Sequence, residues 1–109
     1  MLPKKYRLKH KKDIERVIKE GRYFYGPIFW FKIIRNSETF CRLALIVPKK
    51  SYKKAVTRNR LKRVFTSIVE QKVRKMPNFD IVVYFKNQKV LPPRTELQKE
   101  ADKIILAVH

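Results

Sequence analysis

The residues best suited to chemistry in this sequence form a cluster of positive charge between Lys49 and Arg63. The segment reads KKSYKKAVTRNRLKR and holds eight Lys or Arg side chains but no acid. The nearest carboxylates are Glu38 before it and Glu70 after it. Ammonium and guanidinium groups at this density donate hydrogen bonds to phosphate oxygens and neutralise their charge. The segment therefore predicts binding of a polyanion, most simply a nucleic acid.

The cluster is expected to lie on a helix rather than on a loose tail. Apolar residues at 61, 64, 65, 68, 69 and 73 follow helical spacing and predict a helix over residues 53–75 with a buried stripe. Lys54, Arg58 and Lys62 then share an exposed face. Cations at a helix start oppose the helix dipole, whereas a phosphate there would meet both backbone N–H groups and Arg side chains. The candidate contact residues are Lys49, Lys50, Lys53, Lys54, Arg58, Asn59, Arg60, Lys62 and Arg63.

Residues for catalysis by the protein itself are missing from the sequence pattern. The nine acids form no cluster that could hold two metal ions, and the two histidines, His10 and His109, face no plausible nucleophile. We expect no catalytic residue and no metal site in the protein. Cys41 is alone, which excludes an internal disulfide and a cysteine zinc cluster, and its apolar neighbours predict a buried thiol.

Composition predicts one small folded domain over residues 1–109. The chain is 44% hydrophobic, which is enough for a core despite a net charge of +19. No segment resembles a signal peptide or a membrane span, so we expect a soluble, cytoplasmic protein that does not bind membranes.

Patterning predicts three helices and four strands. Residues 1–10 are expected to form an extended basic arm. Helices are expected at 11–20, 53–75 and 94–108, and strands at 23–25, 28–34, 39–47 and 79–85. In the second strand, Trp30, Lys32 and Ile34 should face one side and Phe29, Phe31 and Ile33 the other. The order αβββαβα indicates an α+β fold, an α-β sandwich with helices on a four-stranded mixed sheet.

Several ordered motifs resemble the bacterial ribonuclease P protein subunit. The segment 55–63, AVTRNRLKR, is similar to the family signature, with its Ala-Val followed by Arg-Asn-Arg and Lys-Arg. Arg42-Leu43-Ala44 and Val47-Pro48-Lys49-Lys50 resemble two further family motifs, and Asp80-Ile81-Val82-Val83 resembles its last strand. The likeness covers nearly the whole chain.

The resemblance implies a fold and a function. The fold would be similar to the second domain of ribosomal protein S5, with a left-handed βαβ crossover around the signature helix. The protein would assist a catalytic RNA that uses Mg²⁺ to remove the 5′ leader of precursor tRNA, with one protein for each RNA subunit. Residues 49–63 would dock on ribonuclease P RNA, and a cleft between the first helix and the sheet would hold the single-stranded leader.

The resemblance places the leader-binding candidates at Ile14, Ile18, Trp30, Lys32 and Lys86. Ile14 and Ile18 stand where the family usually has Phe, and Lys86 stands in place of an Arg. On the signature helix, Thr66 occupies a position that is usually Arg, and Ala44 replaces a common Gly. Trp30 or a tyrosine of residues 23–25 could stack on a base, and Lys32 could contact a phosphate.

Other functions remain open from the sequence. A structural RNA-binding protein of the ribosomal kind, without a role in cleavage, has the same composition. A nuclease acting alone would need a metal cluster, and a membrane-active cationic protein would need an exposed apolar helix face.

The charge excess generates a prediction about stability. Self-repulsion at +19 disfavours the compact state, so salt or polyvalent anions should stabilise the fold. We expect the thermal unfolding midpoint to rise with added sulfate, and to rise less with chloride at equal ionic strength. A midpoint independent of both salts would contradict this expectation.

Overall fold

The computed structural model describes residues 2–87 and 90–108. The elements follow the predicted order, with a short 3-10 turn added in the arm. They are η1 (Lys4–Tyr6), α1 (Lys11–Glu20), β1 (Arg22–Phe24), β2 (Phe29–Arg35), β3 (Arg42–Ile46), α2 (Ala55–Val73), β4 (Phe79–Phe85) and α3 (Arg94–Val108). The predicted α+β class with a four-stranded mixed sheet is confirmed.

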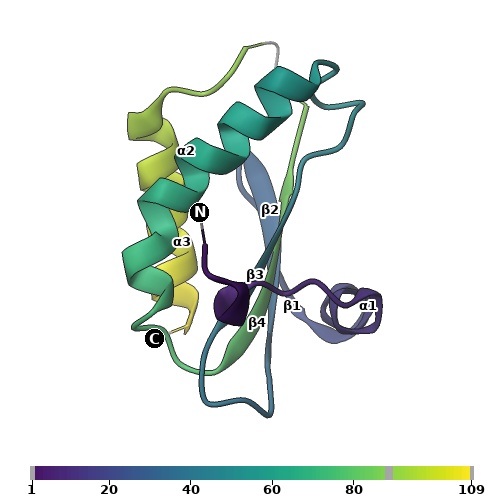
Figure 1. Ribbon diagram of the computed structural model, residues 1–109, viewed down its shortest axis with the longest axis vertical. Helices are drawn as coiled ribbons and strands as arrows, with labels where there is room; N and C mark the ends of the chain where they lie inside the picture. Colours follow the sequence, from purple (N-terminus) through teal and green to yellow (C-terminus); the bar gives the residue numbers. More distant parts are fainter. Residues whose placement is uncertain (1, 88–89, 109) are drawn as a thin grey trace.

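The sheet has the strand order β1-β2-β4-β3. The β1–β2 and β2–β4 pairs are antiparallel, and β3 pairs with β4 in parallel. Helix α2 connects the parallel pair and is the crossover that the sequence led us to expect. Figure 1 shows α2 and α3 against one face of the sheet and α1 against the other. The sheet therefore separates two cores of unequal size.

The larger core lies between the sheet and helices α2 and α3. The alternation predicted for β2 is confirmed, because Phe29, Phe31 and Ile33 are buried on this side. Phe29, Phe65 and Phe85 meet edge to face, with ring centroids 5.2 to 5.4 Å apart. Edge-to-face contacts of this kind add to the stabilisation from burial. This core fixes α2 against the sheet and so sets which face of α2 is exposed.

The smaller core holds α1 and Leu8 of the N-terminal arm on the opposite face, whereas Leu2 belongs to the larger core. Leu8, Val17, Ala44 and Val82 form its buried centre, and Ile14, Ile34 and Ile46 pack around them. The extended arm expected for residues 1–10 is wrong in part, since residues 4–6 form a 3-10 turn, Leu2 and Leu8 are buried, and Leu8 N–H donates to the Leu43 carbonyl. The apolar side chains at positions 2 and 8 account for the difference, because burying them stabilises a docked arm.

Gly21 allows the chain to pass from α1 directly into β1. A Cβ atom at this position would collide with the carbonyl oxygen of Val17, which the Gly21 N–H itself bonds at 2.8 Å. The abrupt end of α1 therefore depends on glycine.

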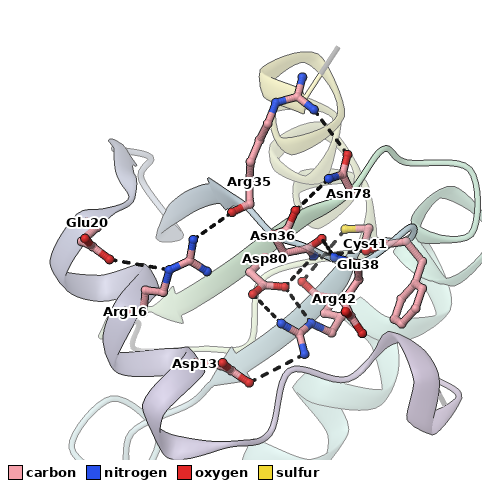
Figure 2. Close-up of polar contacts among 11 residues, drawn as sticks. Asp13, Arg16, Glu20, Arg35, Asn36, Glu38, Cys41, Arg42, Asn78 and Asp80 are labelled. Atoms are coloured by element: carbon pink, nitrogen blue, oxygen red, sulfur yellow. Dashed lines mark hydrogen bonds and ion pairs between the residues drawn. The ribbon is translucent and has the colours of Figure 1, made fainter.

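A buried polar network links β3, β4 and α1 at one end of the sheet (Figure 2). The Asp80 side chain is fully buried in β4 and accepts two hydrogen bonds of 2.8 Å from the Arg42 guanidinium and one of 2.8 Å from the Asn36 amide. Arg42 also lies 3.7 Å from Asp13 of α1. The bonds to Asp80 raise the pKa of Arg42 above its ordinary value.

This network generates a prediction for Arg42→Met. The substitution keeps the aliphatic stem but leaves the Asp80 carboxylate buried without its cation, which should cost about 3–5 kcal/mol of unfolding free energy. Urea denaturation measures the change. Lys11→Met is the matched control, because the Lys11–Glu15 pair is exposed and contributes at most about 0.5 kcal/mol. Equal losses in both variants would contradict a structural role for the buried pair.

Candidate nucleic-acid interface

The loop before α2 is held in a fixed shape by its own backbone. The Pro48 carbonyl accepts hydrogen bonds from the N–H groups of Ser51 and Tyr52 at 3.0 and 3.1 Å. The Ser51 hydroxyl donates to the carbonyl of Phe85 at 3.1 Å, which ties the loop to the end of β4. The side chains of Lys49, Lys50, Lys53 and Lys54 remain exposed. A rigid loop thus presents four cations next to the start of a helix.

The positive charge of this region is not paired with a carboxylate in the part of the chain that the structure describes. Helix α2 begins at Ala55 with no acid in its first turn and no side-chain cap at Lys54. Among residues 2–87 and 90–108, no ion pair includes a residue of segment 49–63. Cations that oppose the helix dipole without compensation cost stability in the free protein. The same arrangement favours a bound phosphate, which meets side-chain and backbone donors together.

Arg58 differs from its expected place on the exposed face of the helix. Its side chain is half-buried, and Nη1 donates to the carbonyls of Tyr52 and Lys53 at 2.9 and 2.8 Å. The i, i+4 spacing places Arg58 on the same side of the helix as Lys54, but the loop folds back over it. Arg58 therefore holds the basic loop against α2, and this bonding satisfies carbonyls that would otherwise lack partners.

The remaining signature residues lie on two sides of α2. Asn59, Lys62 and Arg63 line one hollow together with Val56 and Thr66. Arg60 lines another hollow, beside Val64 and the segment 91–94. Asn59, Arg60, Lys62 and Arg63 are all exposed. A partner that contacts the whole signature must therefore wrap around the N-terminal half of the helix.

An aromatic surface lies on the face of the sheet that also carries α1. The rings of Trp30 and Tyr84 are stacked across β2 and β4, with centroids 4.9 Å apart and planes 6° from parallel. Tyr23 of the edge strand β1 lies 5.8 Å from Trp30 and is exposed. Trp30, Tyr84 and Tyr23 form what we call the aromatic platform. Tyr23 is exposed and the other two rings are half-buried, and accessible aromatic rings of this kind stack with unpaired bases.

Tyr84 was not among the residues that we singled out. The alternation of Asp80, Val82 and Tyr84 in β4 places Tyr84 on the face opposite the main core. The sequence does not indicate that β4 pairs with β2, and this pairing brings Tyr84 beside Trp30.

The other leader-binding candidates are only partly brought together. The Lys32 ammonium donates to the Ile18 carbonyl near the end of α1, so these two residues lie beside each other. Ile14 instead packs in the small core. Lys86 donates to the Gly26 carbonyl at 2.9 Å and lies 3.8 Å from the centre of the Tyr25 ring, so its ammonium is turned toward the β1–β2 turn.

The described part of the chain offers no group of three His, Cys, Asp or Glu side chains that could hold a metal ion. His10 is exposed, and His109 lies outside the described residues. Burial raises the pKa of Cys41 to about 12, so the thiol that we expected to be buried is also unreactive. Within residues 2–87 and 90–108, no helix is long and apolar enough to cross a membrane.

Comparison with known families gives one consistent match. The profile of the family described as Ribonuclease P matches residues 2–108. The chain is 33% identical over 98 residues to the ribonuclease P protein component of Aliivibrio salmonicida, which covers 90% of this chain and 84% of that protein. It is 39% identical over 72 residues to the component from a Pseudanabaena species, covering 65% of this chain and 62% of the relative.

Solved structures agree with the sequence relatives. The ribonuclease P protein of Thermotoga maritima, solved with 1-(4-fluorophenyl)-2-thiourea, is 25% identical and superposes with a TM-score of 0.80 over 94% of this chain and all of that one. The protein from Staphylococcus aureus is 27% identical, with a TM-score of 0.74 over 99% of this chain and 92% of that one.

The geometry of α2 predicts different stability effects for the two signature arginines. Arg58→Ala removes two side-chain bonds to loop carbonyls and should lower the free energy of unfolding by about 1–2 kcal/mol. Arg60→Ala removes an exposed cation and should change it by less than about 0.5 kcal/mol. Urea denaturation of both variants measures the two changes. Equal losses of unfolding free energy would contradict the role of Arg58 in holding the loop against α2.

Proposed function

The chain belongs to the ribonuclease P protein family, and from this premise we propose that it is the protein subunit of a ribonuclease P that removes the 5′ leader from precursor tRNA. In this proposal the RNA subunit carries the active site, and the protein binds both that RNA and the precursor. The observation that carries the proposal is the unneutralised basic segment 49–63, which has the signature motif and belongs to a chain matched by the family over residues 2–108.

The RNA subunit would dock on the basic loop and on the exposed half of α2. Lys49, Lys50, Lys53 and Lys54 would contact phosphates from the loop, whose fixed shape avoids an ordering cost on binding. Arg58 would hold that loop in place. The exposed residues Asn59, Arg60, Lys62 and Arg63 would contact the RNA from both sides of the helix. Neutralising six to eight phosphates would give a log–log salt slope of roughly −4 to −7.

The leader would cross the aromatic platform. Helix α1 forms one wall, where Ile18 lies near Lys32, and the half-buried Trp30–Tyr84 stack would offer aromatic surface to bases together with the exposed Tyr23 ring. Lys32 would contact a leader phosphate only by leaving the Ile18 carbonyl. Ile14 would support the wall from the small core, and Lys86 would act by holding the β1–β2 turn near the platform.

Mg²⁺ would supply the hydrolytic chemistry when bound, by activating water and stabilising the leaving oxygen. The described residues include no cluster of carboxylates or imidazoles to hold it, so the ion fits RNA phosphates better than this protein. The contribution of the chain is to neutralise phosphate repulsion between two RNAs and to hold the leader in place. We propose one protein for each RNA subunit, acting in the cytoplasm.

A structural RNA-binding protein without a role in cleavage is the competing function. Precursor-tRNA cleavage by a bacterial ribonuclease P RNA distinguishes the two, because a cofactor protein should restore cleavage at Mg²⁺ too low for the RNA alone. Arg60→Ala should weaken this stimulation and make the salt slope of RNA binding shallower by about 1. Gln71→Ala, exposed on the same helix beyond the signature, is the matched control.

Unchanged cleavage on addition of the folded protein would contradict the proposal and favour the structural binder. Cleavage by the protein without RNA would contradict an active site in the RNA subunit.

The aromatic platform generates a prediction for substrate choice. Trp30→Ala removes one half of the stacked pair, so affinity for precursor tRNA should fall by about fivefold or more, while affinity for mature tRNA stays the same. Lys32→Ala should act in the same direction but less strongly, because the Lys32 ammonium already has a protein partner. Binding of both tRNAs to the assembled ribonucleoprotein measures the effect. Equal losses for both tRNAs would place the leader elsewhere.

A further inference from the structure

Two grooves meet beside the signature helix at Lys62 and Thr66. The first encloses about 430 Å³ along the exposed side of α2. The second encloses about 370 Å³ and runs over the outer edge of β3, between α2, the N-terminal arm and α1. Lys62 and Thr66 line both grooves, so the two adjoin along this part of α2, and together we call them the β3-edge groove. Each part falls in the size range of small-molecule sites, about 300–1,000 Å³.

The floor and the rim of the β3-edge groove differ in chemistry. Its floor is apolar and includes Leu2, Ile14, Leu45 and Ile46. Its rim is cationic, and the ionisable residues that line it are Arg7, Lys9, Lys62 and Arg63, with no Asp or Glu.

Arg7 is fixed at this rim, because its Nε donates to the Leu2 carbonyl at 2.6 Å. The other side-chain nitrogens of Arg7 have no partner among residues 2–87 and 90–108, so they are free to donate to a ligand.

An apolar floor between cations matches an unpaired nucleotide. Its base is flat and apolar on both faces, and its flanking phosphates are anionic, whereas a double helix hides its bases and presents only phosphates. We propose that the β3-edge groove receives an unpaired nucleotide of the RNA subunit, with the base on the floor and its phosphates on the rim. This proposal rests on the proposed function and adds a subsite to it.

The position of the groove favours the RNA subunit over the leader. Lys62 belongs to the signature helix, on which the RNA subunit is proposed to dock. The aromatic platform is centred on β2 and β4, and β3 lies between it and the outer edge where the groove runs. The RNA subunit and the precursor-tRNA leader would then bind neighbouring surfaces of the same domain.

Thr66 lies at the border where the two parts of the groove adjoin. Its side chain is short and only 9% exposed, and it is the residue at which the chain departs from the expected Arg. A longer side chain at position 66 would fill the junction. Thr66→Leu therefore closes the groove without changing the charge, whereas Thr66→Val keeps its shape and removes only the hydroxyl.

The first experiment uses methyl NMR of the protein with a short oligouridylate and with an abasic oligomer of the same charge. We expect oligouridylate, but not the abasic oligomer, to shift the methyl resonances of Leu2 and Leu45. The affinity measured at these resonances should fall about fivefold or more in Thr66→Leu and stay unchanged in Thr66→Val and Gln71→Leu. Equal shifts with both oligomers, no shift with either, or unchanged affinity in folded Thr66→Leu would overturn the base site.

The second experiment identifies the RNA in the assembled ribonucleoprotein. A photoreactive group on Val56→Cys lies at the groove mouth, since Val56 is 76% exposed, while buried Cys41 stays unmodified. We expect crosslinks to unpaired nucleotides of the RNA subunit, formed without precursor tRNA. The reaction is repeated with precursor tRNA present. Crosslinks that form only then and lie in the leader, or crosslinks confined to paired nucleotides, would overturn the assignment. Oligonucleotide binding to the groove is measured without any cleavage reaction. A groove that binds no nucleotide can therefore be distinguished from a protein that does not stimulate precursor-tRNA cleavage.

Discussion

The bonded pair of Asp80 and Arg42 is the interaction on which the arrangement of this protein depends. A fully buried carboxylate is tolerated only when its charge and lone pairs are satisfied, and Arg42 and Asn36 supply three donors to Asp80. Asn36 also exchanges hydrogen bonds with Asn78, so the turn after β2 is joined to the start of β4. Through Asp13 the same guanidinium reaches α1. One buried charge thereby positions α1 relative to the sheet.

The ion pairs made by the few acidic residues lie outside the basic segment 49–63 in the described part of the chain. Of the nine, six form ion pairs with residues of the described ranges 2–87 and 90–108: Asp13, Glu15, Glu20, Asp80, Glu100 and Asp102. All six bind partners on α1, β3, α3 or the C-terminal half of α2. The basic loop and the first turns of α2 receive none of this compensation, so their positive potential is available to RNA. The acids stabilise the scaffold and leave the proposed interface unneutralised, which accounts for how a chain of charge +19 can fold and still attract a polyanion.

Sequence patterns predicted the elements well because hydrophobic periodicity reports burial directly. The alternation in β2 and the stripe on α2 were confirmed, and the signature located the basic surface. The hydrogen-bond partners of the basic side chains were not predictable. A side chain such as Arg58 or Lys32 can donate to a carbonyl brought near by the fold as easily as to a phosphate. The order of the strands in the sheet was not predictable from the sequence either. The Trp30–Tyr84 stack and the burial of Thr66 are therefore seen only in the tertiary structure.

The central claim is that the partner of this protein is one catalytic RNA. Its most direct test is to purify the tagged protein from the cells that make it and to identify the bound RNA after stringent salt washes. The account predicts enrichment of a single RNA that cleaves precursor tRNA without protein at high Mg²⁺. Recovery of ribosomal RNA alone, with no RNA that processes precursor tRNA, would contradict it.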